Sequence, residues 1–275
     1  MANGIIRFGI GKPVVWGGPH GKITVAGGPA QQQSITGLDF AGNTSFPSQT
    51  PNTPVLVWNN SILGGTAPFP VYPATYIWKA YPRPNNDAYG SFWTMLFHAK
   101  WQTSSFDQSS DQYYGMHPYC EFGTGDNYWE ISSHGADEFA ASPLITFNQW
   151  YTQVAVVWQA GGTDHLRYYW NWPSTSSVIA VDRTQAAANT DPAIIIGDAP
   201  WNLGFEAPNA ILRGHQFYDT NLSEANIAAE IASPGSFRTP WYLKMNPTPT
   251  DVADESGNNN HPAWYDANRP ALWTE

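Results

Sequence analysis

The side chains in this sequence that could perform chemistry include a group of three carboxylates. Glu121, Asp126 and Glu130 follow one another at spacings of five and four residues. Hydrolysis of a glycosidic bond needs two carboxyl groups that flank it, one as acid and the other as nucleophile or base. On one strand such groups must occupy alternate positions, because successive side chains point to opposite faces. The glycines at Gly123 and Gly125 predict a turn inside the set, so its spacing argues against catalysis.

A second set of polar and aromatic side chains could bind a ligand without transforming it. Flat aromatic rings beside amide, carboxylate and guanidinium groups can stack on a sugar ring and bond to its hydroxyls. The alternative is a solvated sheet face with a weak Glu130–Arg167 ion pair. The predicted patch, on three neighbouring strands, consists of Tyr128, Glu130, Gln153, Arg167 and Tyr169.

This patch depends on which side chains are assigned to the core. Side chains alternate between the faces of a strand, so each core assignment places the intervening residues on the other face. The residues expected to face the core are Trp129, Ile131, Val154, Val156, Trp158, Leu166, Tyr168 and Trp170.

Three further candidates for ligand contacts are expected in loops. Trp172 precedes Pro173, and Trp201 and Asn202 follow Pro200. A tryptophan in a loop can form a platform for a ligand, because loops carry many binding residues. The alternative is a tryptophan that is clamped beneath its own loop.

Composition and charge exclude several classes of partner. The chain has 275 residues, a net charge of −10 and only 12 Lys and Arg, which form no basic cluster. Nucleic acids and anionic membranes are therefore poor partners, and glycans, cations and proteins remain. Cys120 is the only cysteine, which excludes an internal disulfide. The sequence shows no signal peptide and no apolar run long enough to span a membrane.

The pattern of apolar residues predicts an all-β fold. Short β-rich runs alternate with turns that contain Gly, Pro, Asn and Asp, and the low charge argues against long ion-paired helices. Residues 223–231 are the exception. Ser223 is a suitable N-cap, and Leu222, Ile227 and Ile231 form an apolar stripe. We therefore predict a two-sheet antiparallel jelly-roll sandwich with one short helix.

Composition divides the chain into three segments. Residues 1–65 are rich in Gly and Pro and are expected to form either an arm or the first edge strands. Residues 66–235 are expected to form the jelly roll. Residues 236–275 contain Trp241, Trp264 and Trp273, so this tail is expected to pack on the domain or on a partner.

Five segments, in the right order, resemble the concanavalin A-like lectin/glucanase superfamily, in its LamG-like or pentraxin-like branch. They are Tyr128–Ser132, Phe147–Val156, Leu166–Asn171, Ile194–Gly197 and Arg213–Ile227. One turn departs from the family pattern, because Asn171 is followed by Trp172 and not by Gly. The resemblance implies the fold rather than a function, since this fold occurs in lectins, glycanases, lyases and structural modules.

The resemblance also raises the possibility of bound Ca²⁺, which is common in this superfamily. Calcium is held by oxygen ligands, and Asp126 and Asn127 are the predicted donors. They match no EF-hand spacing, and an Asp/Asn-rich turn is usually no more than a turn. The seven histidines show no zinc-binding spacing.

Two hypotheses of function follow, and they are compatible. One is a lectin-like module that binds carbohydrate. The other is a structural component of a virion or of an extracellular surface, such as a phage capsid decoration, that forms homo-oligomers or contacts other subunits. The sequence favours a non-catalytic protein. The alternative is an enzyme of the same fold that cleaves glycans, either a glycoside hydrolase or a polysaccharide lyase.

Overall fold

The computed structural model describes residues 5–8, 12–15, 24–25, 34–41, 54–58, 72–84, 90–91, 94–100, 114–120, 127–133, 136–138, 145–174, 178–184, 192–197, 208–265 and 267–275. For several of these strands it describes the backbone alone. The chain divides into two compact units, Met1–Ile35 and Thr36–Glu275. The first contains an antiparallel sheet of β1 (Ile5–Phe8), β2 (Lys12–Val15) and β3 (Thr24–Val25).

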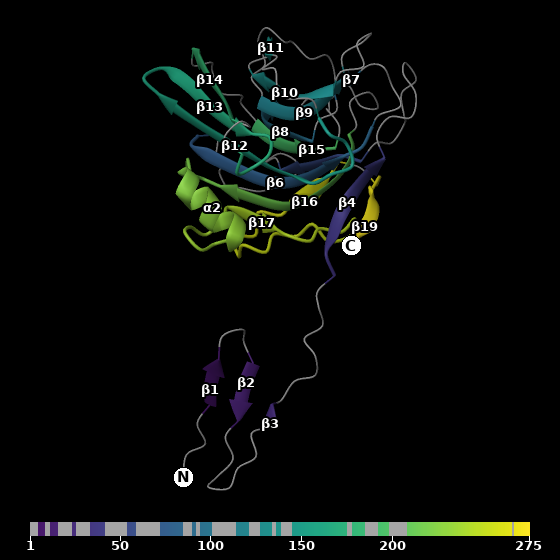
Figure 1. Ribbon diagram of the computed structural model, residues 1–275, viewed down its shortest axis with the longest axis vertical. Coiled ribbons are helices and arrows are strands. Elements are labelled where there is room, and N and C mark those ends of the chain that lie inside the picture. The colour runs from purple at the N-terminus through teal and green to yellow at the C-terminus, as the bar shows by residue number, and fades with distance from the viewer. Residues whose placement is uncertain are drawn as a thin grey trace. The chain divides into compact units, whose positions relative to one another are not determined.

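The second unit contains two antiparallel sheets, each with eight strands among the described residues (Figure 1). The helix-side sheet has the order β14 (Val178–Thr184), β13 (Thr163–Tyr169), β12 (Tyr151–Ala160), β6 (Ala74–Pro82), β16 (Asn209–Tyr218), β4 (Thr36–Ala41) and β19 (Ala271–Thr274), and β17 (Tyr242–Lys244) also pairs with β16. The opposite sheet has the order β11 (Ala136–Glu138), β10 (Asn127–Ser133), β9 (Tyr114–Cys120), β8 (Met95–Lys100), β15 (Pro192–Ile196), β5 (Leu56–Trp58) and β18 (Ala263–Trp264), and β7 (Gly90–Ser91) pairs with β9.

The chain passes repeatedly from one sheet to the other. It runs from β4 to β5, back to β6, through β7–β11, back to β12–β14, and then crosses to β15 and returns to β16. This connectivity produces a two-sheet antiparallel jelly roll. The fold predicted from the sequence is confirmed.

The main hydrophobic core fills the space between the sheets. Its largest side chains come from both sheets and pack edge to face, the arrangement that aromatic quadrupoles favour. The Trp58 ring lies 5.1 Å from that of Phe217 and 4.9 Å from that of Tyr242. All three side chains are almost completely buried. This core joins a strand from the first quarter of the chain to strands from the last quarter.

Helix α2 (Glu224–Ala232) packs on the outer face of the helix-side sheet (Figure 1). The Ser223 hydroxyl caps it by accepting a hydrogen bond from the Asn226 amide, so the predicted helix is confirmed. Ile227 joins a second apolar cluster that includes Ile77 and Val154 of the sheet. This part of the sheet is therefore covered on both faces. No helix in the described part of the chain is long and apolar enough to cross a membrane.

The sandwich begins at Thr36 rather than at residue 66. Strand β4 lies between β16 and β19, and β5 lies between β15 and β18. Both strands are short, and their partners lie far along the chain. Local sequence therefore marks them only weakly, and long-range pairing places them inside the sheets rather than in an arm.

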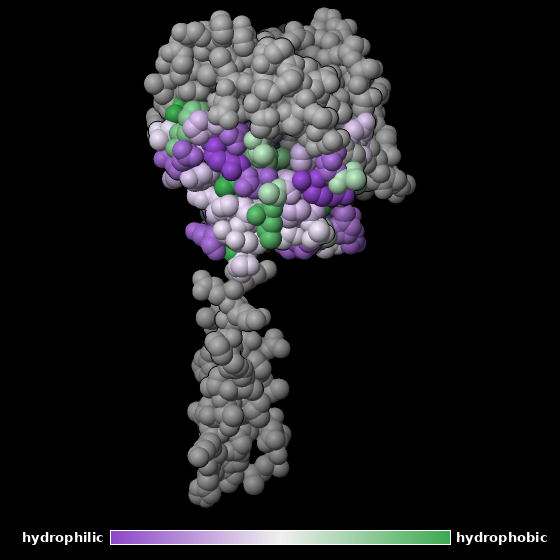
Figure 2. Space-filling view, turned by 90° about the vertical axis from the view of Figure 1, so that its right-hand side faces the viewer, coloured by the Kyte–Doolittle hydropathy of each residue, from purple (hydrophilic) through white to green (hydrophobic). Residues whose placement is uncertain are grey.

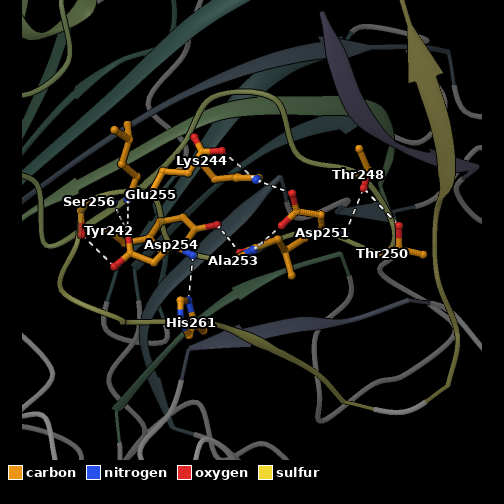
Figure 3. A network of polar contacts seen from close by, with 12 residues as sticks. Tyr242, Lys244, Thr248, Thr250, Asp251, Ala253, Asp254, Glu255, Ser256 and His261 are labelled. Atoms are coloured by element: carbon orange, nitrogen blue, oxygen red, sulfur yellow. Dashed lines mark hydrogen bonds and ion pairs between the residues drawn. The ribbon is translucent and has the colours of Figure 1, made fainter. Parts of the chain in front are cut away.

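The C-terminal segment is held by a network of polar contacts around β17 (Figure 3). The Asp254 carboxylate accepts hydrogen bonds from the amides of Leu243, Ser256 and Asn260. The Asp254 amide donates to His261 Nδ1 at 2.8 Å. This turn brings the chain back toward β18, so Asp254 serves to close a loop.

Lys244 is the buried cation of the same network. Its Nζ donates to Asp251 and Glu255, each at 2.8 Å. Burial alone would lower the pKa of Lys244, but these two hydrogen bonds outweigh burial and raise it. The hydrogen bond from Lys244 also lowers the pKa of Asp251. The contribution of Asp251 to stability is therefore lost only as the pH falls below the usual pKa of a carboxylate. The contribution of Lys244 is lost only as the pH rises above the usual pKa of an amine.

Candidate functional site

Aromatic and polar side chains, half-exposed except for the buried Tyr169, gather on the outer face of the helix-side sheet, where β12 and β13 run side by side. We call this set the outer aromatic patch. Its members come from β12, from β13 and from the turn that follows β13. They are Trp158, His165, Arg167, Tyr169 and Trp172.

Strand register determines one end of the patch. Trp158 of β12 lies directly opposite His165 of β13, and their rings stack at 5.1 Å with an interplanar angle of 15°. The guanidinium of Arg167 lies 5.8 Å from the centre of the Trp158 ring. Such a position favours attraction between the cation and the ring face. Trp158 is therefore held as a flat surface between an imidazole and a guanidinium.

The other end of the patch is built on Tyr169. Its ring packs edge to face against Trp172 at 4.9 Å, and its hydroxyl donates a 2.9 Å hydrogen bond to Glu224. Burial, together with this hydrogen bond, raises the pKa of Tyr169. The amide of Trp172 donates to the Thr152 carbonyl at 2.8 Å, which ties the turn to β12. Trp172 is thus positioned by the sheet and remains half exposed.

Acidic groups border the patch on two sides. The carboxylate of Asp182 lies 2.6 Å from His165 Nδ1, and Glu224 accepts the hydrogen bond from Tyr169. The surface therefore combines flat rings with donors and acceptors of both charges. Such a surface can stack on a pyranose ring and bond to its hydroxyls.

The structure brings together some of the predicted residues and adds others. Arg167 and Tyr169 share the outer face, with Trp172 beside them. Trp158 was expected to face the core, but it lies on this outer face, as do Val154 and Val156. The prediction failed because this strand is apolar on both faces, so alternation alone does not show which face is the core.

Gln153 is not part of this surface, which corrects the prediction. It is completely buried, and its Oε1 accepts a hydrogen bond from Thr94 at 3.3 Å. Its neighbours in β12, Tyr151 and Ala155, belong to the main core. Gln153 therefore connects the two sheets instead of meeting solvent.

Tyr128 and Glu130 are also separated from the patch. They lie on β10, which pairs with β9 and β11 in the opposite sheet. The prediction of three neighbouring strands was wrong, because the chain changes sheets between β11 and β12. Strands that are consecutive in sequence are often but not always paired.

The remaining predictions fall largely outside the described residues. Trp201, Asn202 and Asp126 all lie there, whereas Asn127 is the first residue of β10. No group of three or more His, Cys, Asp or Glu side chains arranged to hold a metal occurs among the described residues. Calcium at Asp126 and Asn127 stays a prediction.

Comparison with known proteins finds only weak structural similarity. No family model matches the chain, and no curated protein matches it. A native heptameric SAP-like pentraxin from Limulus polyphemus is similar in structure, with a TM-score of 0.44 and 13% identity over 88% of this chain and 92% of the pentraxin. Peanut lectin with a nine-residue peptide has a TM-score of 0.28 and 6% identity over 68% of this chain and 94% of the lectin. At these TM-scores, neither likeness bears on ligand or assembly.

Proposed function

We propose that this chain is a carbohydrate-binding module and that its outer aromatic patch binds a neutral saccharide. The module performs no chemistry on that saccharide. The ring of a sugar stacks on Trp158 or Trp172, and its hydroxyls bond to Arg167 and Glu224.

One observation carries this proposal: two half-exposed tryptophans lie on one sheet face, and each is held by contact with a neighbouring ring. Stacking on His165 orients Trp158, and the Tyr169 ring orients Trp172. Rings that are already fixed lose little conformational entropy when a ligand binds. Both rings also lie at the edge of the apolar cluster beneath α2, so a purely structural role is the competing explanation.

Binding of neutral oligosaccharides distinguishes these roles. We expect a glycan array to identify a neutral ligand and Trp172→Ala to weaken its binding roughly 10-fold to 30-fold, as when an anchor residue is truncated. Trp158→Ala should have a similar effect. Affinity electrophoresis or calorimetry with the identified glycan gives the measurement.

Trp264→Ala is the matched control, because this half-buried tryptophan of β18 also has an arginine over its ring, with Arg269 at 5.1 Å. Its binding should equal that of the unmodified chain. Absence of binding to every neutral glycan would refute the proposal, and so would an equal loss of affinity in the control.

A role in assembly at a virion or an extracellular surface is the second candidate function. It is supported by the separate N-terminal unit, Met1–Ile35, whose three short strands form their own sheet. A unit of this kind can pair with a neighbouring copy. Light scattering should then show a trimer or larger assembly for the full chain and a smaller species for residues 36–275. A strictly monomeric full chain would contradict this role.

The glycan-cleaving alternative has less support. Two of its three carboxylates, Glu121 and Asp126, lie outside the described residues, and Glu130 lies on β10 of the opposite sheet. It stays a prediction from the sequence.

A further inference from the structure

Two cations lie side by side on the outer face of the helix-side sheet, and one of them, Lys79, pairs with Thr152, whose carbonyl accepts the hydrogen bond from the Trp172 amide. Lys79 of β6 is directly opposite Arg213 of β16, and each is half-buried. Like charges in this position are destabilising. Burial lowers the pKa of Lys79, Arg213 lowers it further, and Glu275 opposes both effects. None of the ion pairs between described residues includes Lys79, Arg213 or Glu275.

Two tryptophans frame this pair of cations. The Arg213 guanidinium lies 4.7 Å from the centre of the Trp150 ring and 5.6 Å from that of Trp273, and the two rings are 5.2 Å apart. Gly37 lies opposite Trp273 across β4 and β19. A Cβ atom on Gly37 would come within 3.4 Å of the Trp273 ring and 3.0 Å of Ile211. The glycine thus allows the Trp273 ring to lie close to the sheet.

A β-bulge shapes the floor of the same region. The register of β16 against β6 shifts between Arg213 and Gln216, and Gly214 has a φ of +68° there. Such bulges redirect side chains and often lie beside functional sites. The aliphatic stem of Lys79 passes 3.6 Å from where a Cβ of Gly214 would be. Arg213 Nε is buried and has no hydrogen-bond partner among the described residues.

We propose that Lys79, Trp150, Arg213 and Trp273, the cationic tryptophan cluster, bind an acidic saccharide. The carboxylate of the sugar completes the charge balance of the two cations, in hydrogen bonds of the stronger, charge-assisted type. Its ring stacks on a tryptophan. Because the chain as a whole carries a charge of −10, this local excess of positive charge requires a specific explanation.

The surroundings fit an open site rather than a deep pocket. Lys79 follows Ile77 by two residues on the same face of β6, and α2 packs on Ile77. The cluster lies next to β4 and β19. On the side where these two strands lie, strongly hydrophilic side chains are interspersed with small apolar patches (Figure 2). A chain of sugars could lie along such a surface.

Calorimetry of the full chain with tri-galacturonate tests this proposal. We expect measurable binding that weakens with added salt, and at least a tenfold loss of affinity in Arg213→Met and in Lys79→Met. Glu275→Gln should bind more tightly, because it removes a competing carboxylate. Arg269→Met, which removes the cation over Trp264, should bind like the unmodified chain.

Several results would overturn the proposal. One is no binding of tri-galacturonate, and another is unchanged affinity in Arg213→Met. If the neutral trisaccharide bound at the same residues as tightly as tri-galacturonate, the two cations would have no role in binding. Equal affinity for acetate or sulfate would reduce the cluster to a general anion site. Arg213→Met and Lys79→Met leave Trp158 and Trp172 unchanged, so failure of this proposal and failure of the neutral-glycan proposal are distinguishable.

Stability provides a second measurement in case a variant binds poorly for structural reasons. If Lys79 is retained for a ligand, Lys79→Met relieves the repulsion from Arg213 and raises the midpoint of thermal unfolding without ligand. A lower midpoint would show that the cations support the fold and would contradict the proposal.

Discussion

Replacement of Glu230 by alanine is expected to lower the free energy of unfolding by about 3 kcal/mol, because it leaves several buried donors without a partner. Glu230 is completely buried on α2, yet its carboxylate accepts hydrogen bonds from four donors. Three are backbone amides of the following turn, and the fourth is a tyrosine hydroxyl. They are Gly235 at 2.5 Å, Phe237 at 2.7 Å, Arg238 at 2.8 Å and Tyr218 at 2.9 Å.

Urea unfolding measures this effect, and an unchanged m-value would show that the unfolded state is unaltered. Glu224→Ala on the same helix is the matched control, with an expected loss of about 1 kcal/mol or less from the first turn. The turn at 233–240 should also become more sensitive to proteases in Glu230→Ala. A loss no larger than that of the control would show that water replaces the carboxylate without penalty.

We expect acid to destabilise this protein through His215, by about 1.4 kcal/mol for each pH unit between the ordinary pKa of histidine and the lowered pKa of His215. Burial lowers the pKa of His215 from 6.5 to about 3. Between these values the unfolded chain binds a proton at this position and the folded chain does not. Stability is therefore fully present above pH 6.5 and is lost as the pH falls toward 3. The imidazole packs near Phe217, with ring centres 6.4 Å apart, and lies opposite Lys244 on β17.

Comparison with His215→Leu isolates this effect, since leucine has no proton to bind. Unfolding free energies measured from pH 6.5 to about pH 4.5 should fall about 2 kcal/mol further for the unmodified chain than for the variant. This interval stays above the range in which the Asp251 carboxylate titrates, because its pKa is lowered. Parallel slopes in His215→Leu and the unmodified chain would contradict the assignment to His215.

Strand β12 shows why the binding surface could be only partly predicted. The segment Tyr151–Ala160 contains apolar residues in both phases of its alternation, so either face could be the core. The polar residue Gln153 faces inward because Thr94 satisfies it there. Val154 and Val156 face outward because α2 covers them. The position of the helix, which no local pattern specifies, decides between the two phases.

The first and last strands of the sandwich show a related limit. Val55–Trp58 reads as a short strand in the sequence, but its partners are Ile194–Ile196 and Ala263–Trp264. Pairings across more than a hundred residues leave no mark on local composition. The assignment of residues 1–65 as an arm or as edge strands therefore had to remain open until the pairing was known.

The functional residues divide in the same way. Arg167, Tyr169 and Trp172 were accessible to sequence reasoning, because alternation and a proline-containing loop placed them outside the core. Lys79 and Arg213 showed no signal, since they are isolated cations 134 positions apart in the chain. Their meeting depends on the pairing of β6 with β16 and on the bulge at Gly214.

The sequence alone determined that this acidic protein is a β-sandwich with a helix capped at Ser223, since turn residues, alternation and capping act over a few neighbours. Its carboxylate spacing also argued against catalysis on a single strand. The tertiary structure alone decided which strands are adjacent and which face of each is covered. It thereby decided which rings and charges meet, because those choices depend on packing between distant segments and not on any local preference.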